Sequence, residues 1–293
     1  MTRQSITLSV SHQVPDIEVP VIHTFINNRY QQILRRWQWS FLKDRSILTT
    51  VAPYDTGTVA ITSGATAVVG TGTTWTSAMA GRQLRVSTLS EYYEISSVTD
   101  ATNLTLRFAY GGSTVTAATY SIFQHIYPLT STAKEIISMV YNWNLRPRTR
   151  EQIDRWDAER RSTGTPQWWI NLGKDSSGNQ LVEIYPTPSA AYPLRYEFYK
   201  SVTAMTANTD SPLVREDVLE AAVLVDCYRY AARTNRDYLP LLGDARMEFQ
   251  ALLQEAIEED TRIESQSEGV RDAYEPISYS DTFWASHEPP IYF

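Results

Sequence analysis

The sequence predicts an α+β fold: a helical bundle core with an inserted small all-β domain, a β-hairpin and an extended C-terminal arm. Two observations predict this class. Apolar residues recur every three or four positions in the first and last parts of the chain, as in amphipathic helices. Between them, residues 53–128 are rich in Thr, Val and Gly and divide into short runs bounded by turn residues, which is typical of strands.

The same changes of pattern predict the domains. A helical body takes residues 1–52 and 129–270 and carries a β-hairpin at 166–201. The β domain, 53–128, is inserted into this body, at little entropic cost because loop-closure entropy grows slowly with loop length. Residues 271–293 form the extended C-terminal arm.

Composition limits the possible functions. The 293 residues are 42% hydrophobic and 20% charged, which is enough apolar material for a core. A net charge of -7 argues against a protein whose main activity is to bind nucleic acid through its phosphates. The 18 tyrosines and 8 tryptophans exceed the needs of a core, so we expect extensive contacts between subunits.

Cysteine usage and targeting signals indicate the compartment. The single cysteine, Cys227, excludes an intramolecular disulfide and a cysteine metal site. No apolar run approaches the roughly 20 residues of a membrane span. No signal-peptide core follows Met1. We therefore expect a soluble protein that is assembled in a reducing cytoplasm and has no membrane contact.

The N-terminal part is predicted as a short extended lead, residues 1–15, followed by a helix. Asp16 is the expected cap of that helix, and Pro20 fits its first turn. One side of the helix is apolar and comprises Ile22, Phe25, Ile26, Ile33, Leu34 and Trp37. A cluster at its end is interpreted as core closure, with a stacking platform for a base or a sugar as the alternative; it comprises Trp37, Trp39, Phe41 and Leu42.

The β region contains five or more short strands, which predicts a small barrel or sandwich. The strand segments are those around Val59 and Ile61, around Val68 and Val69, and at 92–95, 104–106 and 120–123.

Residues 129–165 are predicted to return to helix. Thr130 or Ser131 caps a segment whose apolar residues are Ile136, Ile137, Met139 and Val140. Thr149 caps a second, highly charged helix, EQIDRWDAERR. A helix this polar is either solvated or a contact between subunits.

Two or three strands are predicted next, with segments at 167–172, 181–185 and 194–200. The loop 175–179 joins the first two as a hairpin. Two helices in series then follow, and their apolar faces are expected to pack as an antiparallel hairpin.

The first of these two helices opens at Ser211 and Pro212, and its apolar positions are Val214, Val218, Ala221, Val225, Tyr228 and Ala232. The second begins near Asp237 and ends at about Glu264, and its apolar positions are Leu242, Ala245, Phe249, Leu252 and Ala256, with Ile263 as a further candidate.

After Glu268 the helical pattern stops, and the chain becomes rich in proline and aromatic residues. Prolines oppose a helix, while disordered segments are poor in aromatics. We interpret this terminus as an arm that orders on a partner, with its rings filling pockets; a strap over the protein's own surface is the alternative. The candidate binding residues are Tyr274, Tyr279, Phe283, Trp284, Tyr292 and Phe293.

Motifs for catalysis or cofactor binding are missing from the sequence. The histidines lie in separate segments without ligand spacing, and they are His12, His23, His125 and His287. There is no GxSxG, no Cys-His arrangement and no GxxxxGK. We therefore expect no catalytic residues, no cofactor and no enzyme activity.

Two stretches are candidates for binding a metal ion or a basic partner. Asp175, Ser177 and Asn179 imitate the start of a calcium loop, but Pro186 takes the place of its closing glutamate, so we expect no metal there. The run of Glu255, Glu258, Glu259 and Asp260 is interpreted as a solvated helix face, with a surface for a basic partner as the alternative.

Three stretches resemble bacteriophage head-to-tail connector proteins. Trp37-Gln-Trp39-Ser-Phe41-Leu42 resembles the end of their first helix. The step from Gly72 to Trp75, with Gly81 before a strand, is similar to a small β module of phage virion proteins. Tyr185-Pro-Thr-Pro188, followed by residues 192–199 and two helices, resembles the second half of the same connectors. The chain most resembles the head-to-tail adaptor, or tail accessory factor, of short-tailed phages.

This resemblance implies a structural virion protein at the head-tail junction. Such adaptors form a homo-oligomeric ring, usually of about twelve copies, under the portal protein. Their C-terminal extension embraces the portal, and the opposite face receives the tail nozzle or tail tube protein. Genomic double-stranded DNA passes through the ring without specific binding, which an acidic lining would favour. The alternative function is a tail-associated protein that binds a carbohydrate or receptor through its β domain.

Overall fold

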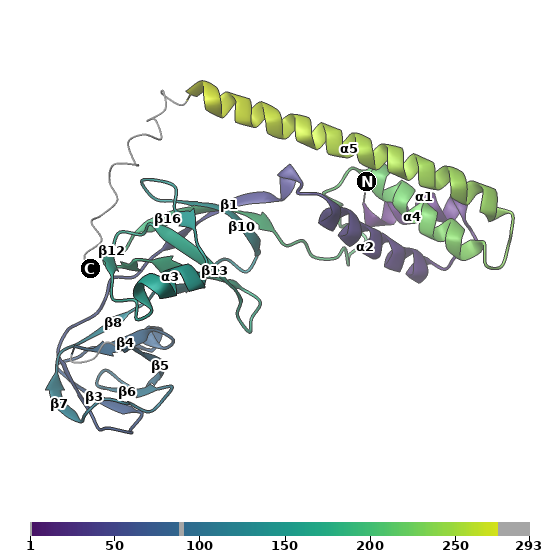
Figure 1. Ribbon diagram of the computed structural model, residues 1–293. Helices are drawn as coiled ribbons and strands as arrows, with labels where there is room; N and C mark the ends of the chain where they lie inside the picture. Colours follow the sequence, from purple (N-terminus) through teal and green to yellow (C-terminus); the bar gives the residue numbers. More distant parts are fainter. Residues whose placement is uncertain (1, 88–90, 275–293) are drawn as a thin grey trace. The chain divides into compact units, whose positions relative to one another are not determined.

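The computed structural model of the chain describes residues 2–87 and 91–274, with side chains described up to residue 263. It contains both helices and sheets, as expected of an α+β protein (Figure 1). The described residues form two compact units. A helical unit comprises the residues up to Leu42 and from Val202 on, and a sheet unit comprises Lys43–Ser201.

Four α-helices and a short 3-10 helix make up the described part of the helical unit. They are α1 (Arg3–Gln13), α2 (Val19–Arg36), η1 (Ser40–Leu42), α4 (Glu216–Ala231) and α5 (Tyr238–Tyr274). Helix α2 packs against α1 and α4, and α4 also packs against α5. The last two helices run antiparallel, as the sequence predicted (Figure 1).

Helix α1 corrects the prediction of an extended lead at residues 1–15. The Ser5 backbone N–H donates to Thr2 Oγ1, and the Thr2 N–H donates to Ser5 Oγ at 2.8 Å, which together form a capping box. Ile6 and Val10 are four residues apart and both fully buried. The capping box thus starts the helix, and the short apolar stripe packs it against the rest of the helical unit.

Helix α4 begins at Glu216, not at the predicted Ser211 and Pro212. The chain before it is held against α2 by side chains of that helix. Met205 N donates to Asn27 Oδ1 at 3.0 Å, and Leu213 N donates to Tyr30 Oη at 3.2 Å. These bonds fix the chain before α4 against α2.

Helix α5 continues to Tyr274 instead of ending at about Glu264. After Pro240, which lies in the first turn of α5, the next proline is Pro276. A proline disfavours helical backbone at the residue before it, so the helix can continue as far as Tyr274. The first four residues of the predicted arm, 271–274, are therefore helical, which corrects that part of the prediction.

A curled seven-stranded sheet occupies the first half of the sheet unit. Its strands are β2 (Thr58–Ile61), β3 (Ala67–Thr71), β4 (Gln83–Val86), β5 (Tyr93–Val98), β6 (Asn103–Leu106), β7 (Val115–Ala118) and β8 (Tyr120–Phe123), with η2 (Ser77–Met79) between β3 and β4. The strand order is β7-β2-β3-β6-β5-β4-β8. Strands β7 and β8 lie at the two ends of this order yet are separated in sequence only by Thr119, so the sheet curls round to bring its ends together. Alternate residues such as Val59 and Ile61 fill the enclosed core.

Two further sheets and one helix complete the sheet unit. Strands β1 (Lys43–Thr49), β16 (Pro193–Lys200) and β10 (Ala133–Val140) form one sheet in the order β1-β16-β10. Strands β11 (Arg146–Pro147), β13 (Trp168–Lys174), β14 (Gln180–Tyr185) and β9 (Ile126–Pro128) form the other, in that order. A small pair joins β12 (Thr163–Gly164) to β15 (Thr187–Pro188), and the helix is α3 (Arg150–Asp157).

The hairpin and the polar helix of this region were predicted from the sequence, and both are present. Strands β13 and β14 pair antiparallel around the 175–179 loop. Thr149 caps α3 through a capping box with Gln152. The third predicted strand, β16, joins the other sheet instead of extending the hairpin.

Strand β10 corrects the prediction of a helix that carries Ile136, Ile137, Met139 and Val140. Two register shifts against β16 interrupt the strand's alternation. As a result the buried residues are Ala133, Ile136 and Met139, three positions apart, which imitates a helical period.

The compact units divide the chain at 42/43 and 201/202, so residues 43–52 and 129–201 lie in the sheet unit together with the 53–128 region. Among the described residues, no helix is both long enough and apolar enough to cross a bilayer.

Candidate assembly surfaces

The predicted binding arm lies almost wholly outside the described residues. Tyr274 is the last residue of α5, and its side chain is not among those described. Tyr279, Phe283, Trp284, Tyr292 and Phe293 lie beyond the described range. Their role stays a prediction.

A groove of about 660 Å³ runs between α2 and α4 in the helical unit. Residues spaced three or four apart on α2 line one wall, because such residues share a helix face. In the groove the rings of Phe25 and Tyr230 meet edge to face with centroids 6.0 Å apart. Tyr230 keeps 41% of its surface exposed. The groove therefore offers aromatic surface to another molecule.

Three arginines and one carboxylate set the charge of this groove. Arg29 donates from Nε and Nη2 to the two carboxylate oxygens of Asp226, at 2.6 and 2.5 Å. Arg229 Nη1 lies 3.5 Å from the same carboxylate. The guanidinium of Arg233 lies over the Tyr230 ring, 5.5 Å from its centroid. One carboxylate thus serves two arginines, and the groove keeps a positive excess.

Part of the acidic run on α5 is structural. Asp260 is only 5% exposed and accepts hydrogen bonds from Trp37 Nε1 at 3.2 Å and from Ser40 Oγ at 2.5 Å. The Ser40 backbone N–H adds a third bond at 3.1 Å. Asp260 therefore holds the end of α2 against α5 and departs from the predicted solvated face. Glu255, Glu258 and Glu259 are exposed.

The aromatic cluster at the end of α2 has a mixed role. Trp39 is 2% exposed, donates from Nε1 to the Ile33 carbonyl at 3.0 Å and stacks on Phe41. Leu42 is also buried, so these residues close the core as predicted. Trp37 is 38% exposed and held by Asp260.

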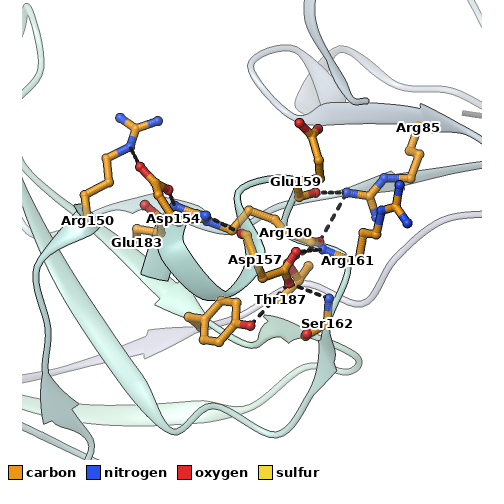
Figure 2. A network of polar contacts seen from close by, with 11 residues as sticks. Arg85, Arg150, Asp154, Asp157, Glu159, Arg160, Arg161, Ser162, Glu183 and Thr187 are labelled. Carbon is orange, nitrogen blue, oxygen red and sulfur yellow. Dashed lines mark hydrogen bonds and ion pairs between the residues drawn. The ribbon is translucent and has the colours of Figure 1, made fainter. Parts of the chain in front are cut away.

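A buried arginine organises the sheet unit around α3 (Figure 2). Arg160 has a left-handed φ of 50° and only 2% of its side chain exposed. Its Nε donates to Glu183 on β14, its Nη2 to Asp154 at 2.5 Å and its Nη1 to the Asp157 carbonyl at 2.6 Å. These contacts fix the end of α3 against the sheet.

The loop after α3 is fixed from both sides. The Asp157 carboxylate accepts from the backbone N–H groups of Arg161 and Ser162, at 2.8 and 2.7 Å. Burial opposes ionisation, yet these bonds keep the pKa of Asp157 below its usual value. From β4, Arg85 donates to the carbonyls of Glu159 and Arg160, and these contacts join the curled sheet to the loop (Figure 2).

His125 lies buried beside this network, 2% exposed. Burial, with the positive charges of Arg160, Arg150 and Arg85, lowers the pKa of His125 to about 3. Its Nδ1 has no hydrogen-bond partner. The imidazole is therefore neutral at pH 7 and serves as a packing group.

The remaining polar candidates are used locally. Asp175 accepts from the backbone N–H groups of Ser177 and Asn179 and so shapes the 175–179 turn. Burial, followed by the charge of Asp226, raises the pKa of the Cys227 thiol to about 12. Within the described ranges, no group of three or more His, Cys, Asp or Glu side chains could hold a metal ion.

The profile of a protein family described as SU10 adaptor protein matches residues 100–274, which is more than half of the chain. The matched range begins before β6 and covers the strands from β6 to β16 and the helices α3, α4 and α5. No curated protein matched the sequence.

Proposed function

Because the chain belongs to the SU10 adaptor protein family, whose members are structural adaptors of bacteriophage particles, we propose that it forms the ring that joins the portal protein to the tail. Membership makes the chain a virion component that contacts other head or tail proteins. The proposal goes further in naming those partners as the portal protein on one side and a tail nozzle or tail tube protein on the other.

The observation that carries the proposal is the family match across 100–274, because that range includes both helices of the C-terminal hairpin and the α3 network. The chemistry of the described residues agrees with an assembly protein. Several of its charged groups are joined in fixed pairs, such as Arg160 with Glu183 and Arg29 with Asp226. Side chains held in this way preserve a shape on which partners can assemble, and we propose that the protein works by binding, without catalysis.

In this proposal about twelve copies form a closed ring, since cyclic symmetry is the usual way to close repeated contacts. The end of α5 and the arm that follows it contact the portal, through the rings of Tyr274, Tyr279, Phe283, Trp284, Tyr292 and Phe293. Ordering such an arm costs about 2–5 kcal/mol, which aromatic anchors repeated around a ring can offset. Genomic DNA passes through the ring, and we expect an acidic lining to keep the duplex from adhering. We extend the proposal to the adaptor of a short-tailed phage.

Electron microscopy of the purified protein mixed with its portal protein tests this proposal. We expect rings docked on the portal with the full chain. A chain truncated after Tyr274 should keep its helical circular dichroism and fail to dock. A full chain that leaves the portal bare at micromolar concentrations would overturn the proposed function. Docking by the truncated chain would overturn only the role of the arm.

A further inference from the structure

We propose that the groove between α2 and α4 receives the acidic side of helix α5 from a second copy of this chain, so that neighbouring copies join through two different surfaces. The inference rests on the proposed ring and specifies its contact. The acidic side of α5 consists of Asp244, Glu248, Glu255, Glu258 and Glu259 and is called the α5 stripe below.

The groove supplies the positive half of the contact. Arg229 and Arg233 stand at the groove, and their side chains are exposed to solvent. Asp226 is their carboxylate neighbour, and it is already engaged by both oxygens with Arg29. The charge of Arg233 and much of that of Arg229 are therefore available to a partner. Tyr and Arg side chains in one groove are typical of residues that carry binding energy in protein interfaces.

The α5 stripe supplies the negative half. At about 100° per residue, its five carboxylates fall on roughly a third of the helix circumference. Between residues 244 and 260, Arg246 is the only basic residue. Arg215 contacts Glu255 and Glu259 at 3.2 Å each, so one cation is shared by these two carboxylates. The stripe keeps a clear negative excess.

An exposed apolar side chain accompanies the stripe. Met247 lies next to Glu248 and is 68% exposed. A thioether makes favourable contacts with aromatic rings, and the groove contains the rings of Phe25 and Tyr230. The two surfaces therefore match in apolar as well as charged chemistry.

The lengths of the two surfaces also agree. The groove extends along α2 from Val21 to Gln32, about 17 Å at 1.5 Å per residue. The stripe from Asp244 to Glu259 is about 22 Å long by the same measure. A helix face seated in a groove is a recurrent mode of protein recognition.

The partner has to be another molecule. Within one copy, α5 turns its buried residues Ala245, Leu253 and Ala256 to the rest of the helical unit. The stripe lies on a different part of the helix circumference, where Arg215 contacts Glu255 and Glu259, so it does not enter the groove of the same copy. A contact between two different patches is heterologous. Repeated contacts of this kind close into a ring when the rotation between copies allows it.

A charge-swap experiment on the full chain tests this contact. The groove variant carries R229E and R233E, and the stripe variant carries E248R and E258R. Sedimentation velocity at low and at high salt measures self-association, from about 1 to 100 μM. We expect each variant alone to associate at least about tenfold more weakly than the natural chain, because it places like charges opposite each other.

The chain that carries all four substitutions restores the complementarity in reverse, and we expect its association to return to within about threefold of the natural level. A matched control, R146E with R155E, makes the same change in net charge on exposed arginines of the sheet unit. It should leave association unchanged. Circular dichroism and thermal melting confirm that each variant is folded.

The outcomes separate this inference from the proposed function. Three results would overturn the contact. The groove variant could associate as strongly as the natural chain, the four-substitution chain could fail to restore association, or the natural chain could remain unassociated at 100 μM. Rings of the groove variant docked on the portal in electron micrographs would also overturn it, while leaving the proposed function intact.

Discussion

Arg160 and Glu183 form an ion pair from which solvent is almost excluded, with 2% and 1% of their side chains exposed. The pair links the end of α3 to β14. One oxygen of Glu183, Oε2, has no hydrogen-bond partner. The cost of burying the carboxylate charge is therefore offset mainly by Arg160. A buried charge that loses its partner is far more costly than a pair replaced as a whole.

We expect R160M to lower the free energy of unfolding by about 3–5 kcal/mol, because Glu183 would stay buried and unpaired. The double variant R160M with E183L should lose clearly less. Urea unfolding followed by circular dichroism measures both. The control is R155M, which breaks the exposed Arg155–Glu151 pair and should cost about 0.5 kcal/mol or less. Equal losses for R160M and R155M would contradict the assigned burial effect.

His125 makes the stability of the protein depend on pH. Its folded pKa of about 3 lies below the value of 6.5 for an unperturbed histidine, so below pH 6.5 the unfolded chain binds the proton and the folded chain does not. The stabilisation is present above pH 6.5 and is lost as the pH falls toward 3. Between pH 7 and pH 5 we expect a loss of about 2 kcal/mol.

Urea midpoints measured at several pH values check this dependence. The variant H125F keeps an aromatic ring beside Tyr92 and Phe123 without a titrating group. Its stability should change little between pH 7 and pH 5. If the stability of H125F changed with pH as steeply as that of the natural chain, groups other than His125 would be responsible for the effect. The lowered pKa of Asp157 acts in the same direction, but only below the ordinary carboxyl pKa, near pH 4.

Asp260 should be the most costly acidic residue of α5 to remove. D260A deletes the acceptor for Trp37 and for both donors of Ser40. Hydrogen bonds to a charged group contribute about 1.5–3 kcal/mol, so we expect a loss of at least about 2 kcal/mol. E258A, on the exposed side of the same helix, serves as the control and should cost about 0.5 kcal/mol or less. Comparable thermal melting temperatures for the two variants would contradict this account.

Two glycines should respond to alanine in opposite ways. Gly243 lies within α5, and a Cβ there would meet no atom within 4 Å, so G243A should raise stability by about 1 kcal/mol. At Gly70 a Cβ would come within 2.4 Å of Thr73 Oγ1 and 2.8 Å of the Trp75 ring. G70A should therefore lower stability by about 1–3 kcal/mol. Thermal unfolding of the two variants side by side checks the signs.

Local sequence signals were sufficient wherever one element forms from neighbouring residues. Pro20 in the first turn of α2, Thr149 as the cap of α3 and the turn residues of the 175–179 loop all predicted what the structure contains. The predictions failed where tertiary pairing alters the local period. In β10 two bulges place buried residues three positions apart, and only the pairing with β16 reveals a strand.

The candidate surfaces were harder to predict because they join distant parts of the chain. Arg29 and Asp226 are 197 positions apart, and no pattern in the sequence connects them. In the sequence Arg160 is one residue of a charged helix, and its burial depends on Glu183 from a separate strand. The segment around Arg160 is polar throughout, and nothing in its sequence indicated that one of its charged side chains would be buried.

Helix α5 extends about 21 Å from Asp260 to its last residue, Tyr274, at 1.5 Å per residue. A helix of this length is a stiff spacer. A flexible linker with the same number of residues would allow its end to take many positions. A segment attached to it starts from a defined position and explores a smaller volume. Its effective concentration at any site within that volume is correspondingly higher. Removing one helical turn from this spacer would displace the starting point by about 5 Å.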